Sequence, residues 1–313
     1  ELYELAMEAG VRRIVAPNAP FPELLAVVDD ALDRVDRRRS NTIVDARDDA
    51  PKALVRKGRI ITVLSPKGGA GKTTVATNLA AGLARVLPEQ VAIIDLDLQF
   101  GDVADALFLS PTHSLLDVPT KGEVDTARIK LALTPTGHGL HALCAPDDPA
   151  SGEEVSLDAA ARAIDALAAD LEFVVIDTGA GIDAAALTAV ERSTDLVLVG
   201  SLDVPSIRSV RKLICALDQL GMTGAQRHVV LNRADSDVGI TADEVASTLG
   251  MEISVQVPSS RSIPASINAG TPVVVAQPAS AVARPLQQLV GLFVDLPEEP
   301  VKGRRTIRRR GAK

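Results

Sequence analysis

A glycine-rich loop with two lysines stands between an apolar run and a helical pattern, and it constrains the fold of this 313-residue chain more than any other feature. The apolar run is Ile60–Leu64, the loop is Pro66–Thr74, and a helix is expected over Lys72–Val86. In such a strand–loop–helix arrangement, glycines turn backbone N–H groups around an anion, and the helix N-terminus adds partial positive charge. The pattern therefore predicts a phosphate-binding loop; a glycine-rich turn that binds nothing is the alternative.

The side chains of this loop have separate expected roles. Lys72 would reach the β- and γ-phosphates of a nucleotide, and the hydroxyl of Thr73 would hold Mg²⁺. Pro66 stands where the ordinary pattern of such loops begins with glycine. The residues expected to contact the nucleotide are Gly68, Gly69, Ala70, Gly71, Lys72, Thr73 and Thr74.

Short β-branched runs alternate with amphipathic segments from Ile60 onward. Continuous apolar strands separated by helices indicate a doubly wound, mostly parallel α/β sheet with helices on both faces. The expected strands are Ile60–Leu64, Val91–Asp95, Phe173–Asp177, Leu196–Gly200, Val229–Asn232 and Val273–Val275. The expected helices lie around Lys72–Val86, Leu157–Ala168, Ala184–Arg192, Ser206–Leu220, Ala242–Leu249 and Ala281–Leu292.

Two acidic blocks follow apolar strands in this pattern. Asp95 and Asp97 come at the end of one strand, and Asp177 ends another. Ligands of open α/β sheets bind at the carboxyl ends of the strands, where these carboxylates are expected. Loop capping explains an Asp pair equally well, so the inference depends on the order and distance of both blocks after the glycine-rich loop.

Pro66, the additional Lys67 and the two acidic blocks resemble the MinD/ParA family of ATPases, whose phosphate-binding loop is a deviant Walker A box. The resemblance covers roughly residues 57–292 and implies a P-loop NTPase that binds ATP and Mg²⁺ and hydrolyses ATP slowly. It implies that Lys67 crosses to the nucleotide of a second subunit in an ATP-dependent homodimer, so that Lys67, Lys72 and Asp97 are the expected catalytic residues. A solvated loop charge is the alternative for Lys67.

The resemblance implies roles for the acidic residues. Asp97 would orient the attacking water, Asp95 would support the metal shell, and Asp177 would hold Mg²⁺ through water together with Thr73. Residues 178–181 resemble switch II of the family.

Further contacts to the nucleotide follow from the same resemblance. The N–H of Gly181 would approach the γ-phosphate. Asn232 and Arg233 resemble an adenine contact, and Pro258 falls where the family folds a loop against the adenine. Asn232, Arg233 and Pro258 are equally explained as parts of plain turns, because Asn and Pro are common turn residues. The segment Ile263 to Val273 fits a closing helix, turn and strand.

Residues 65–74 and 95–104 resemble the CpaE/TadZ branch, which accompanies tight-adherence (Flp) pilus assembly. Residues 1–36 resemble the last third of the receiver domain that precedes the ATPase in this branch, and Ala16 before Pro17 argues against phosphosignalling. We therefore expect a linker over 37–58, an ATPase domain over 59–295 and a basic tail over 296–313. The expected function is positioning of a pilus or secretion assembly; a partition or septum-site ATPase and a hydrolysis-deficient scaffold are the alternatives.

Charge and cysteine content limit the partners. The segment Lys302–Lys313 carries seven basic side chains and no acid, which leaves 26 basic against 41 acidic groups elsewhere. A body this acidic argues against DNA as a partner. The tail could adhere to an anionic membrane or dock on an acidic partner, and a merely solubilising tail is the alternative. Cys144 and Cys215 exclude a disulfide framework, and both are expected to be buried. We expect a cytoplasmic protein recruited to the membrane or a cell pole.

Overall fold

The computed structural model describes residues 58–120, 126–235 and 239–296. The expected receiver remnant, nearly all of the linker and the basic tail lie outside these residues, so the proposed domain boundaries stay predictions. Within the described part of the chain, no helix is both long and apolar enough to cross a membrane.

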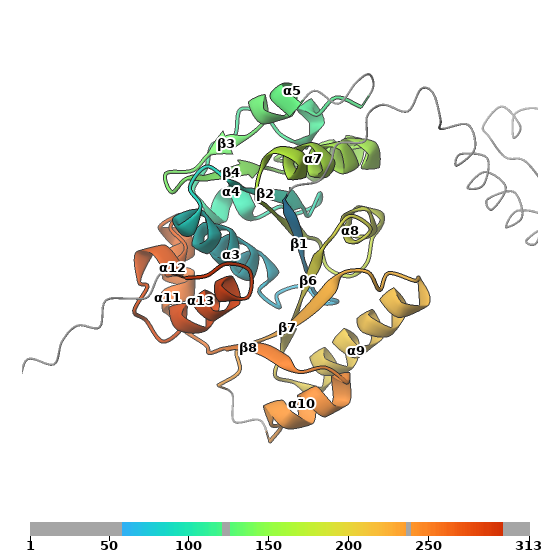
Figure 1. The fold of residues 1–313 in the computed structure, drawn as a ribbon, viewed down its shortest axis with the longest axis vertical. Helices are drawn as coiled ribbons and strands as arrows, with labels where there is room; N and C mark the ends of the chain where they lie inside the picture. The colour runs from blue at the N-terminus through green and yellow to red at the C-terminus, as the bar shows by residue number, and fades with distance from the viewer. Residues whose placement is uncertain (1–57, 121–125, 236–238, 297–313) are drawn as a thin grey trace, which may run out of the picture. The chain divides into compact units, whose positions relative to one another are not determined.

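One eight-stranded sheet organises the described residues, in the order β3-β4-β2-β5-β1-β6-β7-β8 (Figure 1). All neighbouring strands are parallel except β3 and β4, which confirms the mostly parallel α/β prediction. The chain winds outward from the central β1 in both directions, which creates a crevice at the carboxyl edge of the sheet. The strands are β1 (Arg59–Leu64), β2 (Val91–Leu96), β3 (Thr134–Pro135), β4 (Leu140–Leu143), β5 (Phe173–Thr178), β6 (Asp195–Ser201), β7 (Gln226–Asn232) and β8 (Ile253–Val257).

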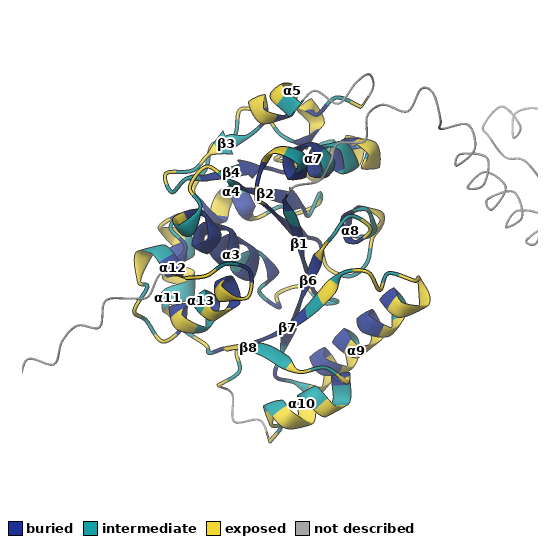
Figure 2. Ribbon diagram, viewed as in Figure 1, coloured by how far each residue is buried: buried dark blue, intermediate teal, exposed yellow. Residues whose placement is uncertain are grey.

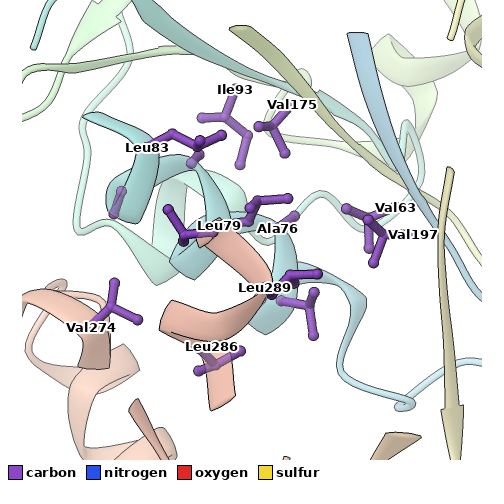
Figure 3. Packing of buried hydrophobic residues seen from close by; sticks show 14 of the residues in the cluster. Val63, Ala76, Leu79, Leu83, Ile93, Val175, Val197, Val274, Leu286 and Leu289 are labelled. Atoms are coloured by element: carbon purple, nitrogen blue, oxygen red, sulfur yellow. The ribbon is translucent and has the colours of Figure 1, made fainter. Parts of the chain in front are cut away.

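Helices cover both faces of the sheet, and the central strands are buried throughout (Figure 2). Alternate strand residues such as Val63, Ile93 and Val175 pack against α3 and α13 in one core cluster (Figure 3). The intervening residues pack on the opposite face against α7, α8, α9 and α10. The helices are α3 (Lys72–Val86), α4 (Val103–Ala106), the 3₁₀ turn η1 (Leu115–Asp117), α5 (Thr126–Leu131), α6 (Pro149–Glu154), α7 (Leu157–Asp170), α8 (Ala184–Val190), α9 (Val204–Gln219), α10 (Ala242–Leu249), α11 (Ser262–Asn268), α12 (Val273–Ala276) and α13 (Ala283–Gly291).

The expected strand Val273–Val275 is wrong, because these residues form the helix α12. Two contacts from α3 hold it: Asn78 Oδ1 accepts a hydrogen bond from the N–H of Val274, and Arg85 donates one to the carbonyl of Val274. Tertiary packing thus overrides the strand preference of three consecutive valines. The closing segment is accordingly helix, turn and helix instead of helix, turn and strand.

The two cysteines differ in environment. Cys144 is buried as expected, and burial together with the Asp95 and Asp147 charges raises the pKa of its thiol to about 12. Cys215 is exposed, so the prediction that it is buried is wrong. It lies on α9, where its side chain falls outside the apolar stripe that packs on the sheet.

Candidate functional site

A cavity of about 1070 Å³ opens at the carboxyl edge of the sheet. Its walls come from the loops that follow β1, β2, β5 and β7 and from the first turns of α3 and α8. This is the crevice that the topology predicts for a ligand. The expected site residues that line it are Gly68, Gly69, Gly71, Lys72, Thr73, Thr74, Asp97 and Arg233.

The glycine-rich loop has the backbone geometry of an anion cradle. Gly69 and Gly71 have φ angles of 71° and 95°, which a side chain would disfavour. Asn232 supports the loop from β7, because its Nδ2 donates a 2.8 Å hydrogen bond to the carbonyl of Ala70. A Cβ on Gly71 would lie 2.3 Å from the same nitrogen, so glycine is required there.

The N-terminus of α3 is left without a side-chain cap. Gly71 occupies the cap position, and the first turn of the helix contains no acidic residue. By contrast, Ser156, Asp183 and Asp203 cap α7, α8 and α9 with side-chain oxygens. The free N–H groups and the partial positive charge of α3 therefore remain available to an anion.

Lys72 is a buried cation, with only 7% of its surface exposed. Among the described residues, no hydrogen bond or ion pair satisfies its ammonium group. Because Lys72 also lines the cavity, the site fits an anionic ligand that pairs with the ammonium group.

Two buried carboxylates stand next to each other behind the cavity, and neither is part of its lining. Asp95 and Asp177 are register partners on the parallel strands β2 and β5, and they are 1% and 0% exposed. Asp95 accepts hydrogen bonds from the N–H groups of Asp97 and Val103, both at 3.0 Å, and so fixes the loop between them. Burial and the neighbouring Asp177 raise the pKa of Asp95 well above its ordinary value.

Neither carboxylate oxygen of Asp177 has a hydrogen-bond partner of good geometry. Burial raises the pKa of Asp177 to about 7, and the nearby Thr73 hydroxyl and Lys72 ammonium offset this only in part. Such a carboxylate, beside a threonine hydroxyl, fits the protein share of a magnesium site, which Mg²⁺ completes with water and phosphate oxygens.

Asp195, at the opposite edge of the sheet, is a buried carboxylate whose oxygens do have hydrogen-bond partners. Burial alone would raise the pKa of Asp195, but hydrogen bonds from His228, Arg59 and Thr194 lower this pKa to about 2. Asp177 and Asp195 are both almost fully buried, and of these two only Asp177 lacks hydrogen-bond partners. Asp177 is therefore the one of the two whose chemistry fits a further ligand.

This state of Asp177 predicts a pH dependence of folding. The folded pKa of Asp177, about 7, lies above that of an unfolded Asp. Between pH 5 and pH 7 the folded protein therefore keeps a proton on Asp177 that the unfolded chain has already lost. Without magnesium and nucleotide, the free energy of unfolding should thus fall between pH 5 and pH 7.5, by about 1.4 kcal/mol for each pH unit up to the folded pKa.

Denaturant unfolding of wild type and Asp177→Asn at both pH values measures this contribution. The variant should lose less stability than wild type on going to pH 7.5, because burial still raises the pKa of Asp95 but Asp177 no longer contributes. Parallel losses in the two proteins would show that Asp177 is ionised in the fold at both pH values.

The loop after β2 is held in place by a hydrogen bond within it and by close packing at two glycines. Asp97 Oδ1 accepts a 3.2 Å hydrogen bond from the N–H of Phe100, while Gly101 packs so closely on Asp95 that a Cβ would lie 2.7 Å from its Oδ2. Gly152 on α6 closes the loop from outside, because a Cβ there would lie 1.8 Å from the carbonyl oxygen of Leu98.

The close approach at Gly152 predicts a loss of stability on substitution. Gly152→Ala should lower the free energy of unfolding by about 1–3 kcal/mol, because backbone has to move to admit the methyl group. Gly137→Ala is the matched control, since a Cβ at Gly137 meets no atom within 4 Å. Urea unfolding should detect the first change and find the control within about 0.5 kcal/mol of wild type; equal curves for both variants would refute the tight packing.

Comparison with known proteins decides the family. Residues 61–273 match the family model of the CobQ/CobB/MinD/ParA nucleotide binding domain, which is more than half of the chain. The chain belongs to this family. The septum site-determining protein MinD of Thermotoga maritima is 28% identical over 225 residues, 69% of this chain and 81% of its own. MinD of Helicobacter pylori is 27% identical over 78% of this chain and 94% of its own.

Solved structures of the CobQ/CobB/MinD/ParA family have the same fold. The cell division ATPase MinD of Pyrococcus furiosus has 26% identity and a TM-score of 0.66 over 74% of this chain and 97% of its own. A ParA family ATPase of Chlorobium tepidum has 22% identity and a TM-score of 0.69, over 74% and 98%. MinD of Pyrococcus horikoshii, solved with Mg-ADP, has a TM-score of 0.67 at 23% identity, over 76% and 100%.

Some expected residues of this family site lie beside the cavity rather than on its wall. Asn232 supports the loop, and the N–H of Gly181 donates a 3.0 Å hydrogen bond to the carbonyl of Ser65 in place of a ligand. Pro258 and Lys67 are half-buried outside the lining. Their contacts with a nucleotide stay predictions.

The cavity also includes residues that the sequence analysis did not single out. Phe100, Asp102 and Asp105 come from the segment that follows Asp95 and Asp97, and Glu153 and Asp183 come from α6 and the cap of α8. Their proximity depends on how three separate loops fold together. Only the position of Phe100 and Asp102 a few residues after Asp97 could have indicated them.

Proposed function

We propose that this protein binds Mg·ATP in the cavity, dimerises on it and hydrolyses it slowly to switch between two states. The observation that carries the proposal is the buried, unpartnered carboxylate of Asp177 close to Lys72, which lines the cavity at a helix N-terminus without a cap. The family contains ATPases, and the P. horikoshii MinD structure holds Mg-ADP. A hydrolysis-deficient scaffold would bind the same ligand without turnover.

The residues divide into binding and catalytic roles. Lys72 and the N–H groups of the loop would neutralise and orient the β- and γ-phosphates. Thr73 and Asp177 would hold Mg²⁺, which supplies charge neutralisation of the phosphates, with Asp95 behind them as a support. Asp97 lines the same cavity and would orient the attacking water, because its carboxylate is fixed by the loop that Asp95 organises.

Lys67 is the residue on which the dimer depends in this proposal. It lies outside the cavity lining, so its ammonium group is not part of the cradle of its own subunit. Lys67→Ala should therefore leave nucleotide binding by the monomer nearly unchanged and abolish ATP-dependent dimerisation, and turnover should fall with it.

Light scattering with a non-hydrolysable ATP analogue and Mg²⁺ measures the dimer. Lys212→Ala, which removes an exposed lysine of α9, is the control and should dimerise like wild type. A Lys67→Ala protein that doubles its mass as wild type does, or a wild type that ignores the analogue, would refute the proposed role.

The proposed output is positioning of a cellular assembly. Residues 65–74 and 95–104 favour a pilus or secretion apparatus, whereas the MinD and ParA relatives equally favour septum-site selection or partition. We propose a cytoplasmic location with recruitment to the membrane or a pole, and no DNA partner. Deletion of the gene separates the two outputs: loss of surface pili with normal division supports the first, and misplaced septa or lost DNA supports the second.

A further inference from the structure

Two exposed aromatic side chains flank the short helix α4. Phe100 and Phe108 are 72% and 82% exposed, whereas Phe173 and Phe293 are 5% and 8% exposed. Only the short helix α4, about 6 Å long, and a few flanking residues separate the two phenylalanines along the chain. We name Phe100, Asp102, Asp105 and Phe108 the aromatic patch.

The fold holds Phe108 outward. Its φ of 53° is left-handed, which is unusual for a bulky residue. Gly270 packs against it so closely that a Cβ on the glycine would lie 2.1 Å from Cβ of Phe108. The ring therefore stays on the surface because the backbone beneath it is fixed.

The acidic members make the patch suited to a basic partner. Asp102 and Asp105 are exposed, and among the described residues neither side chain forms a hydrogen bond or an ion pair. Guanidinium groups stack on aromatic rings and pair with carboxylates. The protein already contains such a contact, since the guanidinium of Arg59 lies 4.9 Å from the ring centre of Phe293.

We propose that the basic segment Lys302–Lys313 of the same copy docks on the aromatic patch. This segment carries seven basic side chains and no acid. Val103 and Leu107, on the buried side of the α4 region, belong to the same core cluster as Leu286 and Leu289 of α13, so the chain leaves the described part from the layer that holds the patch. The twelve residues that follow Leu296 reach the middle of the basic segment. They span roughly 20 Å as a flexible chain and about 40 Å when extended. The helix α3 is about 22 Å long, so a chain of this length can run along it.

Carbodiimide cross-linking of the full chain without nucleotide tests the docking, because it joins carboxylates to lysine amines that touch. In a mixture of ¹⁴N- and ¹⁵N-labelled protein at low salt, we expect Asp102 or Asp105 joined to Lys302 or Lys313 within one copy. The yield should fall at least fivefold in the double variant Phe100→Ser/Phe108→Ser. It should fall equally when Arg304, Arg305, Arg308, Arg309 and Arg310 are replaced by serine.

Leu131→Ser is the matched control, because Leu131 is 75% exposed on α5 and lies outside the patch. It should keep the wild-type yield. Cross-links spread over other acidic residues, pairs that mix the two isotopes, or a yield unchanged by the phenylalanine variants would each overturn the proposal. None of these results would bear on nucleotide binding, which is measured separately.

Discussion

Lys72→Ala should lose at least ten- to a hundredfold in affinity for Mg·ATP, and turnover should become undetectable. The lysine is 7% exposed at the start of α3, where a charge-assisted contact with phosphate is worth about 1.5–3 kcal/mol. Each 1.4 kcal/mol corresponds to a tenfold change in affinity. Titration calorimetry and a phosphate-release assay measure the two losses.

The fold of Lys72→Ala should survive, because the removed cation is buried without a hydrogen-bonded partner. Thermal unfolding without nucleotide is the control, and its midpoint should stay equal to wild type or rise. Wild-type affinity and turnover in the variant would remove Lys72 from the phosphate site. A large drop in the midpoint would instead reveal a structural role for the ammonium group.

Asp97→Ala should keep nucleotide binding within a few-fold of wild type and lower the rate of hydrolysis by roughly a hundredfold or more. The carboxylate lines the cavity, and orientation of water is needed for the reaction but not for binding. A phosphate-release assay at saturating ATP measures the rate. Turnover equal to wild type would assign the catalytic role to another group.

Asp97→Asn separates chemistry from loop support. Asparagine keeps a side-chain oxygen that can accept the hydrogen bond from the N–H of Phe100, so the loop should hold its shape. Because the negative charge of Asp97 is what orients the water in this account, we expect hydrolysis to fall in Asp97→Asn as far as in Asp97→Ala. A nearly active Asp97→Asn with an inactive Asp97→Ala would mean that Asp97 acts through the loop.

The sequence predicted the centre of this fold well because its signals are local there. The helix from Lys72 to Val86 has the expected bounds, and five of the predicted strands are confirmed within a few residues. Continuous apolar runs in the sequence directly predict strands that are buried on both faces of a sheet. The lysine, threonine and aspartates of the site follow these runs at fixed positions, so their gathering at one edge follows from parallel strands.

Features that depend on long-range contacts could not be predicted in this way. Strands β4 and β8 were missed because each is short, and their pairing with β2 and β7 is what defines them. The helix α12 exists because Asn78 and Arg85 on α3 satisfy its backbone. The support of the phosphate loop by Asn232 likewise joins positions 162 residues apart.

Titration of Mg·ATP into the full chain, with and without excess EDTA, tests the central claim most directly. The unpartnered carboxylate of Asp177 and the cavity-lining Lys72 predict one nucleotide bound per chain, with an affinity that falls at least tenfold when magnesium is removed. Asp177→Asn should lose this difference between the two titrations. Absence of binding, or an affinity in wild type that is the same with and without magnesium, would contradict the account.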